Sequence, residues 1–430
     1  MIRRRRMPGP WLPAAIAVLA AVGCEGSAVH ATGPRGSDSF ARFYVIGGAI
    51  AAGTESGGLV AASQAAAWPV LLAAAAGQQL SQALHQAPGC PAPLVAPLVE
   101  LRLLTGAAAV SPDTGCTALI ARFTPPGNNL AIAGATVWDA LNATPRAVNA
   151  PGSTRSLVER TRYSAVLAFT QSQVTATLVG APTLVAVELG LAEVYRAAAS
   201  GLVVAATAYS QPAAWTLVPP AVSLPVVDAI ADSLAKSGAK VVLLSVPPVP
   251  QLPAFRTAAE VWAARGALLP FGIAVQADCA TSPNIVNVAA AVPTLAQRAL
   301  AAPGVQAMSC ASAPGTADGV LAPDEVAAIA SSITQFNAHL RDVATAHGWA
   351  YADLTATYAR MVAAAGPYSP STQLTCALPY GEFVSLDGIH PSVRGQQAIA
   401  DAVAAALDAR YGFGLPLAGN LPGLTAPACP

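Results

Sequence analysis

Asp387 and His390 have the residue types and the spacing that acid–base chemistry needs. They lie three positions apart in Leu386-Asp-Gly-Ile-His-Pro391, a short loop that precedes a helix-like stretch. An aspartate at this spacing can turn its carboxylate onto the imidazole and fix the tautomer of a general base. The pattern alone is of modest specificity, because a pair that merely holds a loop together would look the same. The four other histidines have no such neighbour in the sequence and are expected to be packed or solvated: His30, His85, His339 and His347.

Such a pair needs a rigid scaffold, and the chain alternates apolar segments with helical stretches. The strand candidates are 42–46, 130–132, 183–189, 240–246 and 349–354, and the helix candidates are 64–76, 225–237, 323–347 and 393–408. This alternation predicts a parallel sheet covered by helices on both faces. Three regions exceed a minimal version of that fold, namely 87–124, 252–322 and the tail after residue 411. We expect these regions to be held by disulfides, and the middle one could cover the crevice at the strand ends.

The cysteines fit a protein that folds outside the cytoplasm. Apart from Cys24 there are six, an even number, and none lies in a C-x-x-C pair. Six cysteines permit 15 pairings, and closeness along the chain favours three local disulfides: Cys90–Cys116, Cys279–Cys310 and Cys376–Cys429. We expect no metal and no cofactor.

The first 39 residues have the features of an export signal and a tether. Four arginines at positions 3–6 precede a short apolar run, and Cys24 follows a sequence similar to a bacterial lipobox. We therefore expect a signal peptide at 1–23, a lipid-anchored Cys24 with a tether to residue 39, a domain over 40–411 and a tail over 412–430. Cleavage after Ala31 is the alternative. The expected location is the bacterial cell envelope, lipid-anchored on the outer membrane or periplasmic.

Composition points to a large core and a bland surface. Hydrophobic residues make up 54% and charged residues 10% of the chain, against about 25% charged in ordinary soluble domains. Removal of the four leader arginines from the 22 basic residues leaves 18 against 22 acids. A mildly acidic chain is a poor candidate for binding nucleic acid. No later apolar stretch is long enough to be a convincing membrane span.

Five blocks in order resemble the SGNH, or GDSL, hydrolases. They are Phe43 to Gly53 with the family's strand and G-D-S-L-x-x-G turn, Asn129 to Val137, Leu184 to Gly201 with the G-x-N-D region, Gly238 to Pro253, and the Asp387–His390 loop. The resemblance implies a three-layer α/β/α, flavodoxin-like fold with a central parallel sheet of about five strands. It also implies that Gly134 donates a backbone N–H to an oxyanion and that Gly190 opens the third block.

The departures from this family concern the residues that do the chemistry. In the first block Gly48 stands where the family has aspartate, and Ala49 stands where it has the nucleophilic serine. In the third block Ala192 replaces the oxyanion-binding asparagine. A methyl group cannot attack an ester, so His390 lacks a hydroxyl to activate. Loss of one oxyanion donor typically costs about 10²–10³ in rate.

Three functions remain open on this evidence. The first is a degenerate hydrolase that binds an acyl or other small apolar ligand or acts as an envelope scaffold, with no protein partner named by the sequence. The second is an active carboxylic-ester hydrolase that uses another hydroxyl, with Thr54, Ser56 and Ser385 as the nearby candidates. The third is a purely structural envelope protein. Fold analogy cannot choose among them, because function belongs to the site.

Overall fold

The computed structural model describes residues 36–107, 109, 115–209, 215–302 and 304–416. The chain divides into two units, and only the second, Gly33–Pro430, contains described residues. Cys24, the predicted signal peptide and most of the predicted tether lie outside the described residues. Within the predicted tether, Ser37 already starts a 3₁₀-helix, η1 (Ser37–Arg42), whose Phe40 is buried. None of the helices in the described part of the chain has the length and apolar character needed to cross a membrane.

The centre of the fold is a four-stranded parallel sheet in the order β1-β4-β5-β11. Its strands are β1 (Phe43–Gly47), β4 (Leu184–Glu188), β5 (Lys240–Leu244) and β11 (Ala350–Ala352). Gly47 pairs with Glu188 at the carboxyl ends of β1 and β4. These strands are short apolar runs, and β4 is buried along its whole length, as expected for a sheet covered on both faces.

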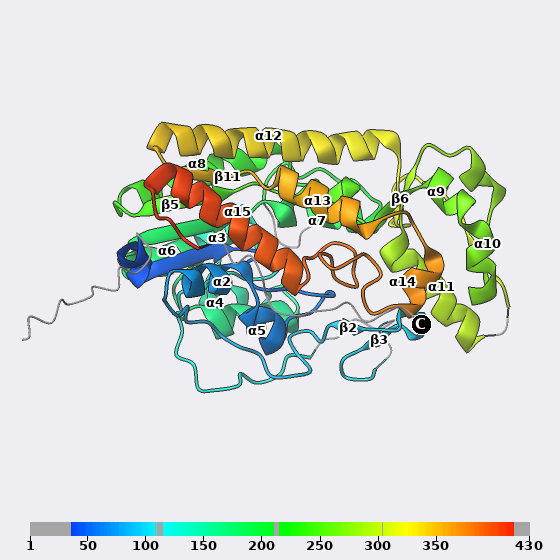
Figure 1. Ribbon diagram of the computed structural model, residues 1–430, viewed down its shortest axis with the longest axis horizontal. Helices are drawn as coiled ribbons and strands as arrows, with labels where there is room; N and C mark the ends of the chain where they lie inside the picture. Colours follow the sequence, from blue (N-terminus) through cyan, green and yellow to red (C-terminus); the bar gives the residue numbers. More distant parts are fainter. Residues whose placement is uncertain (1–35, 108, 110–114, 210–214, 303, 417–430) are drawn as a thin grey trace, which may run out of the picture. The chain divides into compact units, whose positions relative to one another are not determined.

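Helices cover both faces of this sheet (Figure 1). Side chains of α3 (Val137–Asn142), α8 (Pro220–Ala235) and α12 (Pro323–His347) meet β4 and β5 residues on one face. On the other, α15 (Val393–Tyr411) contacts β5, β11 and α2 (Trp68–Ala75). The predicted α/β architecture is therefore confirmed. The remaining helices are α1 (Ala61–Ala65), α4 (Pro145–Val148), α5 (Leu157–Val166), α6 (Gln173–Val179), α7 (Leu191–Ser200), α9 (Ala258–Ala263), α10 (Arg265–Leu268), α11 (Val288–Ala301), α13 (Thr355–Ala365) and α14 (Pro370–Thr375).

Two predicted elements differ in the structure. The predicted fifth strand, 130–132, forms only an isolated bridge between Asn129 and Val45 beside β1. Leu130 N and Ile132 N still donate to Val45 O and Gly47 O, but Gly47 N, which would complete the next pair of the ladder, donates to the Gln173 side chain instead. The predicted helix over 64–76 is two helices, α1 and α2, because Pro69 starts a new helix in its first turn.

The two insertions form structures of their own. Region 252–322 contains β6 (Phe255–Thr257), β8 (Ile285–Asn287) and β10 (Val320–Leu321) in an antiparallel sheet, and β7 (Ile273–Val275) beside β9 (Gln306–Met308). Region 87–124 contains the hairpin of β2 (Leu94–Val95) and β3 (Arg102–Leu103). Two predicted disulfides, Cys90–Cys116 and Cys279–Cys310, are confirmed. Cys376 is also disulfide-bonded; its predicted partner, Cys429, lies outside the described residues, so that pairing stays a prediction.

Candidate active site

Asp387 and His390 form the acid–base pair that their spacing predicts. His390 Nδ1 lies 2.7 Å from Asp387 Oδ2, and both side chains are buried. The carboxylate accepts four further hydrogen bonds, from Gly57 N, Ser385 Oγ, Ile389 N and His390 N. A carboxylate held this completely fixes the orientation of the imidazole.

The surroundings of Asp387 keep its carboxylate ionised. Burial alone would raise the pKa of Asp387, but the positive charge of His390 and the hydrogen bonds from His390 and Ile389 outweigh burial and lower it to about 2. A nearby opposite charge and hydrogen bonds to the charged form both lower the pKa of a carboxyl group. At neutral pH the pair therefore holds a negative charge on the far side of the imidazole.

Residues of two other segments hold the loop of Asp387 and His390 in place. Ser385 Oγ accepts a hydrogen bond from Ser56 N at 2.9 Å, and Ser56 Oγ accepts one from Leu386 N at 3.3 Å. Gly388 has a φ of +69° and lies so close to Ala254 that a Cβ would come within 2.8 Å of its backbone. Ala254 belongs to the 252–322 insertion. This insertion supports the loop, and none of its residues lines the crevice, so the expectation that it covers the crevice is wrong.

The nucleophile position lies in the turn that follows β1. Gly48 N donates to Glu188 O at 2.9 Å, which closes the turn onto the end of β4. Ala49 comes next and is partly buried. Gly53 ends the turn with a φ of +81°, and a Cβ there would come within 2.8 Å of Gln64 Cα. The turn thus keeps the family's two glycine positions while its reactive position carries a methyl group.

Glu188 is a site residue that the sequence prediction missed. Its Oε2 accepts hydrogen bonds from Gly48 N at 3.2 Å and Ala51 N at 2.9 Å, so its carboxylate lies against the turn of Ala49. Burial raises the pKa of Glu188 to about 7, although these two hydrogen bonds and the charge of His390 act in the opposite direction. A signal was available, since an acidic residue that ends an apolar strand of a parallel sheet lies where sites form.

The oxyanion side contains two backbone amides without partners. Among the described residues, no hydrogen bond is formed by Ala49 N or by Gly134 N. Gly134 adopts a φ of +87°, a left-handed conformation that favours glycine. Gly190 precedes α7, and a Cβ there would come within 2.6 Å of Phe336 and Val246. Ala192 lies in the first turn of α7 and offers no side-chain donor.

One crevice of about 190 Å³ brings these residues together. Its lining includes His390 and every predicted position of the nucleophile and oxyanion regions: Gly48, Ala49, Gly134, Gly190 and Ala192. Glu188, Thr54, Arg162 and Tyr195 also line it. The Tyr195 and His390 rings lie 6.0 Å apart between centroids. Among the described residues, neither a serine nor a cysteine lines the crevice.

The three hydroxyls that could replace the missing serine are badly placed. Ser56 and Ser385 do not line the crevice. Their hydroxyls form hydrogen bonds within the Asp387 loop, with Leu386 N and Asp387 Oδ1 respectively. Thr54 does line it, but its Oγ1 is buried and has no hydrogen-bond partner. A substrate carbonyl cannot reach a buried oxygen without movement of the side chain. The alternative in which one of these hydroxyls acts as the nucleophile therefore stays an untested alternative, and the described geometry does not favour it.

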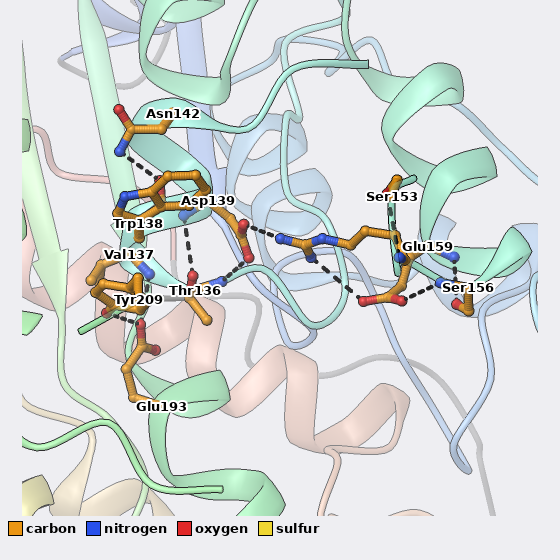
Figure 2. Close-up of polar contacts among 11 residues, drawn as sticks. Thr136, Val137, Trp138, Asp139, Asn142, Ser153, Ser156, Glu159, Glu193 and Tyr209 are labelled. Atoms are coloured by element: carbon orange, nitrogen blue, oxygen red, sulfur yellow. Dashed lines mark hydrogen bonds and ion pairs between the residues drawn. The ribbon is translucent and has the colours of Figure 1, made fainter. Parts of the chain in front are cut away.

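A larger cleft of about 750 Å³ adjoins the crevice. The two share lining residues, among them Gly134, Arg162 and Tyr195. The walls of the cleft carry Trp138, Tyr209 and Trp215 and several charged side chains. Figure 2 shows the polar contacts on one wall, where Glu193 Oε1 accepts hydrogen bonds from Val137 N and Tyr209 Oη.

The remaining described histidines lie outside the crevice. His85 is buried with its Nδ1 3.2 Å from Thr117 O, His347 stacks on Trp349, and His339 lies 2.7 Å from Asp228. His30 lies outside the described residues. Within the described residues no group of three His, Cys, Asp or Glu side chains is arranged to hold a metal ion.

Comparison with known proteins finds similarity only at the level of structure. No protein family and no curated protein matches the sequence. An extracellular lipase from Streptomyces rimosus has a TM-score of 0.35 and 13% identity, over 85% of this chain and 98% of that one. An α/β hydrolase enzyme from the metagenome of Lake Arreo, Spain, has a TM-score of 0.33 and 14% identity, over 85% and 93%.

A third solved structure, from Parabacteroides merdae, is described as a GDSL-like lipase. Its TM-score is 0.29, with 11% identity over 65% of this chain and 71% of that one. At these low TM-scores and identities the likeness says nothing about activity or ligand.

Proposed function

We propose that this chain is a non-hydrolysing member of the SGNH type, whose crevice binds a short acyl group and whose adjoining cleft binds the rest of the ligand. The observation that carries the proposal is that His390 and Ala49 line one crevice in which the described residues supply neither a serine nor a cysteine. A base without a nucleophile cannot start the covalent route that this family uses. The ligand would therefore be held and not cleaved.

The dimensions of the two cavities support this division of the ligand. Ligand pockets usually measure about 300–1,000 Å³, so the crevice of about 190 Å³ is too small for a drug-sized molecule. Glycine, alanine and leucine supply much of its lining, which suits an acyl group. The cleft of about 750 Å³ carries aromatic and charged side chains, which suit a larger polar moiety.

The unpartnered amides explain how an acyl carbonyl would be held. Ala49 N and Gly134 N both belong to residues of the crevice and lack partners among the described residues. A carbonyl oxygen that accepts from both would satisfy two groups that otherwise depend on water. Binding of this kind needs neither the serine hydroxyl nor the asparagine amide that the family uses for catalysis.

A second candidate function is direct hydrolysis by water. The completeness of the Asp387–His390 pair favours it, because the carboxylate accepts five hydrogen bonds and fixes the ring. His390 could then act as general base towards a water molecule beside the Ala49 methyl, with no acyl-enzyme intermediate. In this route His390 is still the base, and water takes the place of the serine hydroxyl as the nucleophile.

A hydrolysis assay separates the two candidates. Purified protein would be incubated with p-nitrophenyl acetate and p-nitrophenyl butyrate, with His390→Ala as the control. We expect no turnover above that of His390→Ala, and binding of the esters in competition with each other. Turnover that is lost in His390→Ala and shows no acyl-enzyme burst would replace the binding function with direct hydrolysis.

We also propose that the chain is exported and anchored to the cell envelope through a lipid on Cys24. The basic leader, the apolar run and the lipobox-like sequence support this. The two local disulfides agree with an oxidising compartment. Mass spectrometry of the mature N-terminus tests it, since a diacylglyceryl group on Cys24 is expected and a terminus at Thr32 would refute it.

A further inference from the structure

We infer that Arg162 is a ligand-binding residue and that the ligand of the crevice carries a carboxylate. This inference rests on the proposed function and adds the charge of the ligand to it. Arg162 lies on α5 and lines both the crevice and the cleft, so a molecule that spans the two passes its guanidinium. It borders the same crevice as Gly134 and His390.

The guanidinium of Arg162 is held in place without being neutralised. Its Nε donates to Cys90 O at 3.0 Å and its Nη1 donates to Ala133 O at 3.2 Å. Both acceptors are neutral backbone carbonyls. An arginine has five N–H donors in a planar fork, so most of the fork stays available on the side of the cavities. Among the described residues no carboxylate forms an ion pair with Arg162.

The acids of the cleft are already engaged elsewhere. Asp139 and Glu159 both form ion pairs with the guanidinium of Arg155. Glu193 accepts hydrogen bonds from Val137 N and Tyr209, and Glu188 accepts from the turn of Ala49. Arg196 adds a further positive charge, with its guanidinium 5.4 Å above the Trp215 ring. Among the described residues, the cavity wall therefore offers two positive charges, Arg162 and Arg196, that form no ion pair with a carboxylate.

Physical chemistry makes this arrangement costly unless a ligand completes it. Burial lowers the pKa of Arg162 to about 10, partly opposed by the charge of Glu159, so the side chain is still charged at neutral pH. A cation withdrawn from water is stabilised by an anion that forms hydrogen bonds with it. A carboxylate matches the planar fork of a guanidinium with two parallel bonds. We conclude that a carboxylate-bearing ligand fits the cavity better than a neutral one.

Sodium butyrate and butyramide test this inference, because they have nearly the same shape and differ in charge. Their affinities would be measured by ligand-observed NMR titration of the mature protein at constant ionic strength. We expect butyrate to bind about tenfold or more tightly than butyramide, the size typical of a charge-assisted hydrogen bond. Equal affinity of the two probes for the wild type would overturn the inference without any variant.

Three variants locate the effect. Arg162→Gln should abolish the preference for butyrate, and Arg162→Lys should keep part of it because the charge remains without the fork. Arg360→Gln is the matched control, since Arg360 is an exposed arginine of α13 that lines neither cavity. A full preference in Arg162→Gln would overturn the inference. If that variant does not fold, a folded Arg162→Lys that keeps the full preference for butyrate, as Arg360→Gln is expected to do, would overturn it instead.

The failure of this inference is distinguishable from the failure of the proposed function. Neither probe contains an ester, so hydrolysis of ethyl butyrate by the wild type would overturn the proposed function and leave the charge preference as measured. Conversely, binding of butyramide and intact ethyl butyrate with no preference for butyrate would keep the proposed function and remove the role of Arg162.

Discussion

The acid–base wall of the crevice, residues 385–390, and its nucleophile wall, Gly48, Ala49 and Ala192, differ in how completely they are equipped. In the first wall Asp387 accepts five hydrogen bonds and orients His390. In the second wall the positions that would carry functional side chains have a hydrogen atom or a methyl group, and the Glu188 carboxylate binds the turn. The first wall thus holds a complete acid–base pair, whereas Gly48, Ala49 and Ala192 bring no reactive side chain to the second.

This difference indicates that the Asp387–His390 pair has a structural role that does not depend on catalysis. The bonds of Asp387 join Gly57 to the loop 385–390 and hold the sharp turn of that loop. They therefore stabilise the loop whether or not His390 ever removes a proton. Ala49 and Ala192 have no comparable structural bonds from their side chains, so nothing in the fold resists their change. A retained pair is thus weak evidence for retained catalysis.

The largest expected effect comes from removing the carboxylate of the acid–base wall. Asp387→Ala leaves buried donors and His390 without their partner, which should lower the free energy of unfolding by about 3–5 kcal/mol. The matched control is Asp353→Ala, which removes an exposed ion pair with Arg341 and a hydrogen bond from Thr355 N at the start of α13 and should cost about 1–2 kcal/mol. Urea denaturation measures both. An Asp387→Ala protein as stable as the control would show that the pair has no structural role.

Restoring the nucleophile wall should have the next largest effect. Ala49→Ser gives His390 a hydroxyl, but the oxyanion then has only backbone donors, so esterase activity should be weak. Adding Ala192→Asn should raise kcat by about 10²–10³, the value of one oxyanion donor. His390→Ala in the double variant should abolish the gain, because these groups act as a unit.

The structure limits how that restoration can be designed. A Cβ at Gly48 would lie 3.8 Å from Glu188 Oε2, so Gly48→Asp would place two carboxylates side by side, which is unfavourable when both are ionised. The double variant should therefore be made with Gly48 unchanged. If Ala49→Ser and Ala192→Asn together give no His390-dependent turnover with p-nitrophenyl acetate, the assignment of these two positions is wrong.

Glu188 gives the nucleophile wall a pH dependence opposite to that of Asp387. A carboxyl whose pKa is raised from 4.5 to about 7 on folding binds more protons in the folded state, so stability falls as the pH rises through that window. Glu188→Gln should keep the acceptor for Gly48 N and remove this loss. Between pH 5 and pH 8 the free energy of unfolding should therefore fall by about 2–3 kcal/mol more in the wild type than in Glu188→Gln.

Thermal unfolding from pH 5 to 8 checks this, with Glu260→Gln as the control because Glu260 is an exposed helix-capping acid. Melting temperatures of the wild type and Glu188→Gln that change in parallel with pH would contradict the account. Asp387 behaves in the opposite sense. Its pKa is lowered to about 2, so its contribution is present above pH 4 and is lost only as the pH falls towards 2.

The smallest effect is expected at Thr54. Its buried hydroxyl has no hydrogen-bond partner, so Thr54→Val should change stability by less than about 1 kcal/mol and should not alter ligand binding. Ser56→Ala is the companion variant, because the Ser56 hydroxyl accepts a hydrogen bond from Leu386 N. Ester turnover by the unmodified protein that either variant abolishes would show that the chemistry has moved to that hydroxyl.

The sequence predicted the parts of the site that depend on short spacings and on strand ends. Asp387 and His390 are three residues apart, so their pairing is a local property. Ala49 and Ala192 follow β1 and β4, and parallel strands bring their carboxyl ends to one edge of the sheet. That rule suffices to bring both positions into one crevice with His390.

The sequence could not predict contacts that depend on distant side chains. Arg162 binds Cys90 O and Ala133 O across 72 and 29 residues, and no local pattern marks it. The insertion 252–322 packs behind the Asp387 loop because Gly388 lets Ala254 approach, which spacing along the chain does not reveal. The predicted fifth strand failed because Gly47 N donates to the Gln173 side chain, 126 residues away, and does not continue the ladder.

The central claim is that the crevice holds an acyl ester without cleaving it, and one experiment observes both parts. Ethyl butyrate would be incubated with the mature protein and followed by saturation-transfer NMR, with His390→Ala as the reference. The account predicts saturation transfer to the methyl group of the intact ester, while butyrate accumulates no faster than in the reference. Butyrate that accumulates in the wild type and not in His390→Ala would contradict it.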